Sequence, residues 1–137
     1  MAYEIPIQAV SFPSTAAVIQ YRCVVLTSGG GVKPSTGQST AAGWVRVIGV
    51  AQDKTTGAGR IVPVLHQGVT KVAASTKAIK VGQYLRATSG AASTATNLGG
   101  TVRPTTSDLL TYAIGQALSS CAAAAAGNQR LIAMRLL

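Results

Sequence analysis

Clusters of glycine and small polar residues divide this chain of 137 residues into short apolar runs. Within several runs, apolar and polar side chains alternate with the two-residue period of a strand that is covered on one face. Near the C-terminus, for example, Ile132, Met134 and Leu136 alternate with Ala133 and Arg135. The pattern predicts an all-β domain, a compact β-barrel or β-sandwich-like fold with short strands.

The apolar runs and their breaks predict the order of strands and loops. The expected strands cover residues 16–27, 44–52, 60–66, 69–74, 80–88 and 128–137. Loops rich in small residues are expected at 33–43 and 89–100, and a hairpin connection at 53–59. In the first strand, the two-residue period places Tyr21 and Cys23 on one face and Arg22 on the other. Pro63 predicts an edge position or an irregularity, because proline lacks the backbone N–H that a central strand donates.

The N-terminal residues differ from the rest in carrying two closely spaced prolines, Pro6 and Pro13. Prolines at this spacing oppose both a helix and a central strand. Residues 1–15 are therefore expected to form an extended arm, which packs on its own domain or reaches a neighbouring copy. The remaining residues, 16–137, are expected to form a single β-rich domain.

One segment supports two interpretations. A helical stripe with a capping Ser107 and a terminal Gly127 predicts a helix over residues 108–126, and the alanine run 122–126 favours it further. The alternative is a strand over 111–118 followed by a loop over 119–127. On pattern alone the two remain open.

An internal comparison favours the strand. Residues 48–52 (Ile-Gly-Val-Ala-Gln) are echoed by residues 114–118 (Ile-Gly-Gln-Ala-Leu), and each segment is followed by small residues, a glycine and an apolar strand. The two stretches are thus predicted to be repeated hairpins. Gly49 and Gly115 would then share one role, which is to let a strand bend or another backbone approach.

The composition limits both the core and the chemistry. Hydrophobic residues make up 47% of the chain but aromatic residues only 4%, so valine, isoleucine, leucine and alanine must build the core. The two cysteines, Cys23 and Cys121, are expected to be buried free thiols. With the single His66 they fall short of a zinc site, so no metal or other cofactor is expected.

Catalytic groups are scarce. The only acids are Glu4, Asp53 and Asp108, and the only histidine is His66. General acid–base and nucleophilic catalysis need such groups within hydrogen-bonding reach of one another. The glycines at 29–31 do not lead into a helix, because Pro34 follows closely, so they do not form a phosphate-binding loop. The chain is therefore predicted not to be an enzyme and to have no small-molecule substrate.

The charge is strongly positive. Twelve basic residues against three acidic ones give a formal net charge of +9, and the basic residues are spread along the chain. Such a general field attracts polyanions: nucleic acid, an anionic membrane or an acidic protein face. The first fifteen residues lack the features of a signal peptide, and no apolar run reaches the length of a membrane span. Synthesis in the cytoplasm and no membrane partner are expected.

The order of short glycine-centred segments resembles a known family. The quoted segments are Ile48-Gly49-Val50-Ala51, His66-Gln67-Gly68, Ile79-Lys80-Val81-Gly82-Gln83-Tyr84-Leu85 and Ala113-Ile114-Gly115-Gln116-Ala117, with Gly59 and Gly127 between them and a terminal strand. Over residues 16–137 this order is similar to that of the tailed-phage capsid decoration, or cement, proteins. Gln83 stands where that family often has an acidic residue, so no charge-based contact is carried over.

The resemblance implies a structural virion protein made in the host cytoplasm. It would sit on the outer capsid surface as a homotrimer at three-fold positions, bind across neighbouring major capsid proteins and stabilise the shell. The N-terminal arm would contact the shell or an adjacent copy. Candidate contact residues are the apolar arm residues Tyr3, Ile5, Ile7, Val10 and Phe12, together with Trp44 and Arg46, which begin a strand.

The alternative function is single-stranded nucleic-acid binding by an OB-like barrel. Such barrels combine a basic groove with aromatic platforms on which bases stack. Here only Tyr84 lies close to strand-borne basic residues, Lys80 and Arg86. Nucleic acid is therefore the less favoured partner.

Overall fold

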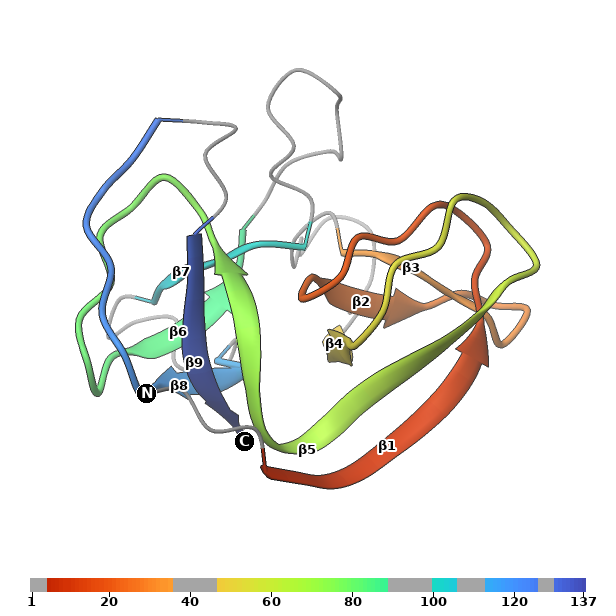
Figure 1. The fold of residues 1–137 in the computed structure, drawn as a ribbon, viewed down its shortest axis with the longest axis horizontal. Coiled ribbons are helices and arrows are strands. Elements are labelled where there is room, and N and C mark those ends of the chain that lie inside the picture. Colours follow the sequence, from red (N-terminus) through yellow and green to blue (C-terminus); the bar gives the residue numbers. More distant parts are fainter. Residues whose placement is uncertain (1–4, 36–46, 89–99, 106–112, 126–129) are drawn as a thin grey trace.

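The computed structural model describes residues 5–35, 47–88, 100–105, 113–125 and 130–137. Within these ranges the chain is all-β, as predicted, and has no helix (Figure 1). The strands are β1 (Ile5–Pro13), β2 (Cys23–Leu26), β3 (Val32–Pro34), β4 (Val47–Ala51), β5 (Ile61–Ala74), β6 (Tyr84–Ala87), β7 (Val102–Pro104), β8 (Gly115–Ala117) and β9 (Arg130–Leu136).

The long strand β5 organises the fold. The sequence predicts two strands here, over 60–66 and 69–74, but the structure has one strand of 14 residues. Gly68, which lies between the two predicted strands, adopts a φ of +117°, and the strand continues through a bend that is visible in Figure 1. The first half of β5 pairs with β1 and β4, and the second half pairs with β9 and β7.

The second half of β5 closes a five-stranded barrel. The strand order runs β5-β7-β6-β8-β9, and β9 pairs back onto β5. The parallel contact between β5 and β7 joins Ala74 to Val102, and the other pairs are antiparallel. The prediction of a compact β-barrel is therefore confirmed. We call this barrel, residues 69–137, the second unit.

The first half of the chain repeats the same connectivity. Strands β3, β2, β4 and β5 follow one another in the sheet, and β1 lies on the other side of β5. A parallel bridge between Ser14 and Val32 corresponds to the one between Ala74 and Val102. We call residues 5–67 the first unit.

Backbone hydrogen bonds confirm the correspondence bond by bond. The Thr15 N–H donates to the Val32 carbonyl at 2.8 Å, and the Ser75 N–H donates to the Val102 carbonyl at 2.8 Å. Three further N–H to carbonyl bonds of the first unit each have a counterpart in the second. The bond from Tyr21 to Ala51 matches that from Gly82 to Ala117, the bond from Ser35 to Cys23 matches that from Thr105 to Tyr84, and the bond from Gln52 to Pro63 matches that from Leu118 to Ala133. The predicted hairpin repeat is confirmed, and it extends to a whole five-stranded unit.

Gly49 and Gly115 hold matching positions, in β4 and β8. A Cβ built on Gly49 would collide with the Leu65 carbonyl oxygen in β5, and one on Gly115 would lie 2.7 Å from the Arg135 carbonyl oxygen in β9. Both glycines therefore allow another backbone to approach, which is one of the two roles predicted for them.

The alanine-rich segment is not helical. Of the predicted helix 108–126, the structure describes residues 113–125, which contain β8 and then irregular backbone, so the helix interpretation is wrong there. The Ala117 N–H donates to the Gln83 carbonyl, and the Ala117 carbonyl accepts from Gly82. These bonds to the segment before β6 override the intrinsic helix propensity of alanine. Residues 108–112 and 126 lie outside the described residues.

Two other expectations about the first unit are wrong in detail. The strand predicted over 16–27 begins only at Cys23, because Tyr21 has a left-handed φ of +62° that interrupts the extended backbone. Val32–Pro34, at the start of the predicted loop 33–43, is the short strand β3, paired with β2.

Pro63 lies in β5, between β1 and β4, and so is not at an edge. Its carbonyl accepts from the Gln52 N–H, but its ring nitrogen cannot donate in return. The side-chain amide of Gln20 donates to the Gln52 carbonyl instead, at 2.9 Å. This side chain compensates for the missing donor and explains how a central strand tolerates the proline.

Residue 82 and its counterpart in the first unit, Tyr21, both have a left-handed backbone conformation. Glycine adopts it freely, whereas tyrosine adopts it with strain. Gly82 has a φ of +86°, and a Cβ there would meet nothing within 4 Å. Gly82→Ala is therefore expected to destabilise the protein through backbone strain alone, by about 1–2 kcal/mol. Urea unfolding measures the loss. Gly29→Ala, also in open space but without a left-handed φ, should be neutral or slightly stabilising, and equal losses in the two variants would contradict this account.

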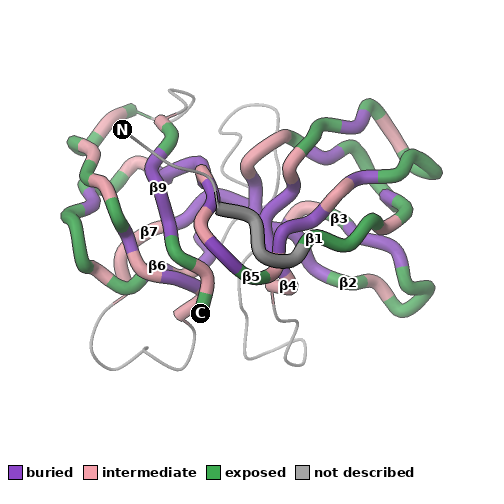
Figure 2. Tube along the Cα trace, turned by 60° about the horizontal axis from the view of Figure 1, so that its bottom comes forward, coloured by how far each residue is buried: buried purple, intermediate pink, exposed green. Residues whose placement is uncertain are grey.

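Buried residues lie in both halves of the molecule (Figure 2). Their side chains form two clusters. Both consist mainly of valine, isoleucine, leucine and alanine, as the composition predicts. Cys23 and Val50 belong to the first unit, yet they join the cluster of the second unit. Their neighbours Val24 and Ala51 join that of the first. Both faces of β2 and β4 are therefore covered, one by their own unit and one by the other.

Candidate interaction surfaces

The described residues hold no cluster of catalytic type. Asp53 follows β4 and His66 lies in β5, while Glu4 and Asp108 fall outside the described residues. No group of three His, Cys, Asp or Glu side chains in the described ranges is arranged to hold a metal ion. Nor does that part of the chain contain a helix with the length and apolar character to cross a membrane.

The candidate contact residues are distributed over β1 and undescribed segments. Tyr3, Trp44 and Arg46 lie outside the described residues. Ile5 and Ile7 belong to β1, whose backbone pairs with β5 of the same chain. Among the arm residues, Val10 has 43% of its surface exposed, whereas Phe12 packs partly against the core of the first unit.

Strand β1 shows how the described part of the predicted arm is held. It pairs with β5 from Ile5, opposite Val69, to Pro13, opposite Ile61, with irregular register near Pro6. The Ser14 N–H then donates to the Arg60 carbonyl at 2.6 Å. Residues 5–13 are thus extended, and they complete the first unit.

The repeat exposes a difference between the units on the outer face of their sheets. In the first unit, Cys23, Val50 and Leu65 form a row of neighbours across β2, β4 and β5, and all three are at most 1% exposed.

The matching row in the second unit crosses β6, β8 and β9 and consists of Tyr84, Gln116 and Arg135. Tyr84 is 41% exposed, Arg135 is exposed and Gln116 is half-buried. The same position in the fold is therefore apolar and covered in one unit and polar and open in the other.

Hydrogen bonds order this open row. The Arg135 guanidinium donates from Nη2 to Gln116 Oε1 at 3.0 Å. Gln116 in turn donates from Nε2 to the Gly82 carbonyl at 3.0 Å. The amide of Gln116 is thereby oriented by both neighbours, and the Arg135 head group is held over β8.

Two further arginines lie beside this row. Arg86 in β6 lies directly opposite Arg103 in β7, and both are half-buried. Burial and, secondarily, the positive charge of Arg103 lower the pKa of Arg86 from its usual value. The Nε atoms of both arginines are buried without a hydrogen-bond partner among the described residues.

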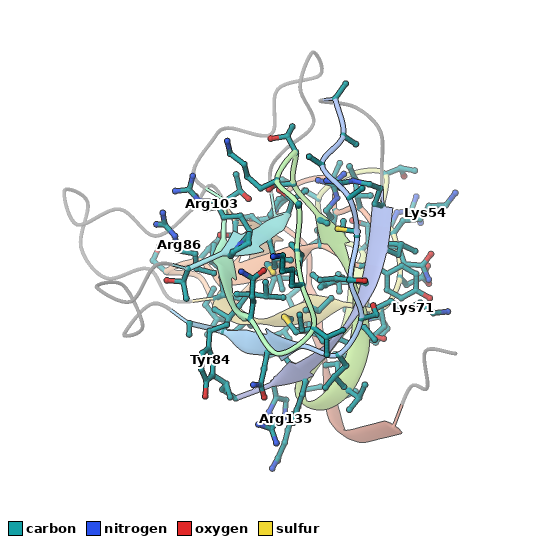
Figure 3. The ribbon with its side chains drawn as sticks, turned by 90° about the vertical axis from the view of Figure 1, so that its left-hand side faces the viewer. Lys54, Lys71, Tyr84, Arg86, Arg103 and Arg135 are labelled. Carbon is teal, nitrogen blue, oxygen red and sulfur yellow. The ribbon has the colours of Figure 1, made fainter. Side chains whose placement is uncertain are left out.

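We call Tyr84, Arg86, Arg103, Gln116 and Arg135 the basic face. Figure 3 shows Arg86, Arg103 and Tyr84 along one side of the molecule, with Arg135 at its lower end and Lys54 and Lys71 on the opposite side. The sequence interpretation found Tyr84 beside Arg86 but not the contribution of Arg103. The sequence alone does not show this contribution, because Arg103 lies opposite Arg86 only through the pairing of β6 with β7.

Comparison with known proteins identifies a matching family and a solved structure with a similar fold. A family model described as phage cement protein matches residues 6–136. Among solved structures, the crystal structure of the head fiber gp8.5 N base in bacteriophage phi29 is similar, with a TM-score of 0.65 and 18% sequence identity; the match covers 95% of each chain. At this identity the likeness shows a shared fold. A search of curated proteins gives no match.

The family match extends over both units, from the second residue of β1 to the last residue of β9. It confirms the resemblance drawn from the order of glycine-centred segments. This chain therefore belongs to the family of phage cement proteins.

Proposed function

We propose that this protein decorates the outer surface of a phage capsid, binding across neighbouring major capsid proteins as a homotrimer at three-fold positions. The observation that carries the proposal is the cement-protein match over residues 6–136. Family membership supports a structural role associated with the capsid, and the protein would reach the virion after synthesis in the host cytoplasm.

The physical properties of the chain support this role. A closed five-stranded barrel and a second five-stranded unit share the continuous strand β5, and together they form a body suited to distributed surface contacts. In a trimer, three weak contacts with the shell reinforce one another, because each one raises the effective concentration for the next. The net charge of +9 would attract the protein to an acidic capsid face.

Apolar side chains on the surface supply area that such contacts would bury. Ile61 in β5 and Leu131 in β9 hold matching positions in the two units, and both are exposed. In the arm, Val10 offers an exposed apolar side chain on β1. We include Tyr3, Ile5, Ile7, Phe12, Trp44 and Arg46 with Val10 in the proposed set of capsid or subunit contacts.

Purified protein added to capsids that lack it should co-sediment with them, and light scattering should report a trimer. Val10→Glu is expected to weaken binding to the capsid by about tenfold, because it places a carboxylate in an apolar contact. Leu26→Glu is the matched control: Leu26 also lies on a strand, and its 44% exposure matches the 43% of Val10.

A point variant is preferred to a deletion of the arm because β1 is part of the fold. Deleting residues 2–13 would remove a strand that completes the first unit, so lost binding would not separate contact from folding. If wild-type protein leaves bare capsids unoccupied, the proposed function is wrong. If both glutamate variants bind as well as wild type, the arm is not part of the contact.

A further inference from the structure

The internal repeat allows the burial of equivalent residues in the two units to be compared. The row Cys23, Val50 and Leu65 is fully buried, and the first two of these residues pack within the cluster of the second unit. No described residue buries the matching row of the second unit in this way, and Tyr84 and Arg135 remain exposed. This face of the first unit thus packs within the chain, whereas the equivalent face of the second unit is exposed.

The chemistry of the open face suits an anionic partner. Like charges directly opposite each other on neighbouring strands destabilise a sheet, and Arg86 faces Arg103 in this manner. Asp53, the one acid among the described residues, follows β4 in the first unit, and neither arginine forms an ion pair within the described part of the chain. A partner that supplied acidic groups would relieve this repulsion.

The residue types favour carboxylates on a protein over nucleic acid or a second copy. Arginine forms paired hydrogen bonds with carboxylates, and tyrosine and arginine are enriched where interfaces gain most of their energy. Bases would need stacking platforms, and the basic face offers only Tyr84 among its five residues. A second copy would bring its own net charge of +9 against the same face.

We propose that the basic face is a docking surface for a carboxylate-rich patch of the capsid shell. Arg86 and Arg103 would pair with the carboxylates, while Tyr84, Gln116 and Arg135 would complete the contact beside them. The proposal deepens the proposed function and depends on it for the identity of the partner. The chemistry of the face can be tested separately.

The test uses Arg86→Glu in two binding assays, one with capsids that lack the protein and one with immobilised poly-L-glutamate. The variant places a carboxylate opposite Arg103, so the free protein should unfold at the same temperature as wild type or higher. Binding in both assays should fall by at least about tenfold. Gain of stability together with loss of binding would not result from a purely structural role. Arg86→Gln, which removes the charge without reversing it, repeats the test if Arg86→Glu does not fold.

Lys54→Glu is the matched control, because it makes the same charge change at an exposed residue on the opposite side of the molecule (Figure 3). Its binding should stay closer to wild type than that of Arg86→Glu in both assays. Equal losses of binding for the two variants would show that binding depends on the overall positive charge and not on the basic face, and would overturn the proposal. A third assay measures binding to single-stranded DNA. If Arg86→Glu loses binding there while its binding to polyglutamate is unchanged, the proposal is overturned in favour of nucleic acid. If wild-type protein ignores capsids while polyglutamate still separates the variants, the capsid function fails and the carboxylate-binding face stands.

Discussion

Replacing Gly49 with alanine is expected to prevent the first unit from closing correctly. The added Cβ would collide with the Leu65 carbonyl oxygen and lie 2.8 Å from Val64 Cγ1. Both residues belong to β5, which is held by β1 on its other side. The strand cannot retreat without losing its register, so the free energy of unfolding should fall by about 3 kcal/mol or more.

Gly115→Ala tests the same contact in the second unit. Its Cβ would lie 2.5 Å from Met134 Sδ and 2.7 Å from the Arg135 carbonyl oxygen. The methionine side chain can move but the backbone oxygen cannot, so a large loss is expected here too, smaller than at Gly49. Urea unfolding compares both variants with Gly57→Ala, whose Cβ would meet nothing within 4 Å. Equal stability of all three variants would refute the close-approach role of the two glycines.

A second large effect is expected at alkaline pH, from Cys23. The thiol is fully buried between the units, and this burial raises its pKa from 9.0 to about 12, with a smaller opposing effect from the charge of Arg22. The folded state therefore keeps the proton over a pH range in which the unfolded chain releases it. The contribution to stability is fully present below pH 9 and is lost as the pH rises towards 12.

The expected slope is up to about tenfold in the unfolding equilibrium constant per pH unit. Urea unfolding between pH 8 and about pH 11 measures it. Lysines and tyrosines also titrate in this range, so the informative quantity is the difference between wild type and Cys23→Ala, which should lose that part of the slope. Cys121→Ala, which removes the only other thiol, is the matched control and should keep it. Identical slopes in wild type and Cys23→Ala would contradict the buried-thiol account.

The two thiols also show how far composition alone can place a residue. The composition predicts that both cysteines are buried and free. Both are free, but only Cys23 is fully buried, and Cys121 is partly exposed. Cys121 lies at an isolated bridge with Ile79, and Arg130 donates to its sulfur at 3.5 Å. Cysteine is a residue type that is often buried, but its individual depth depends on which strands pack over it.

Several features were readable from the chain because they depend on local pattern. Glycine next to alternating apolar residues predicted the hairpins around Gly49 and Gly115, and the low aromatic content predicted an aliphatic core. The continuity of β5 was not readable, because Gly68 is as compatible with a stop as with a bend. Only the pairing of β5 with β1 and β9 on either side of Gly68 distinguishes the two.

The sequence by itself determined the all-β class, the paired glycine-centred hairpins, the aliphatic core and the shortage of catalytic groups. Those properties follow from residue type and two-residue spacing, which act within a few residues of the chain. Only the tertiary structure decided that the row through Cys23 is buried whereas the row through Tyr84 is open. The reason is physical: both rows lie on equivalent strands, and what separates them is whether the other unit packs against that face.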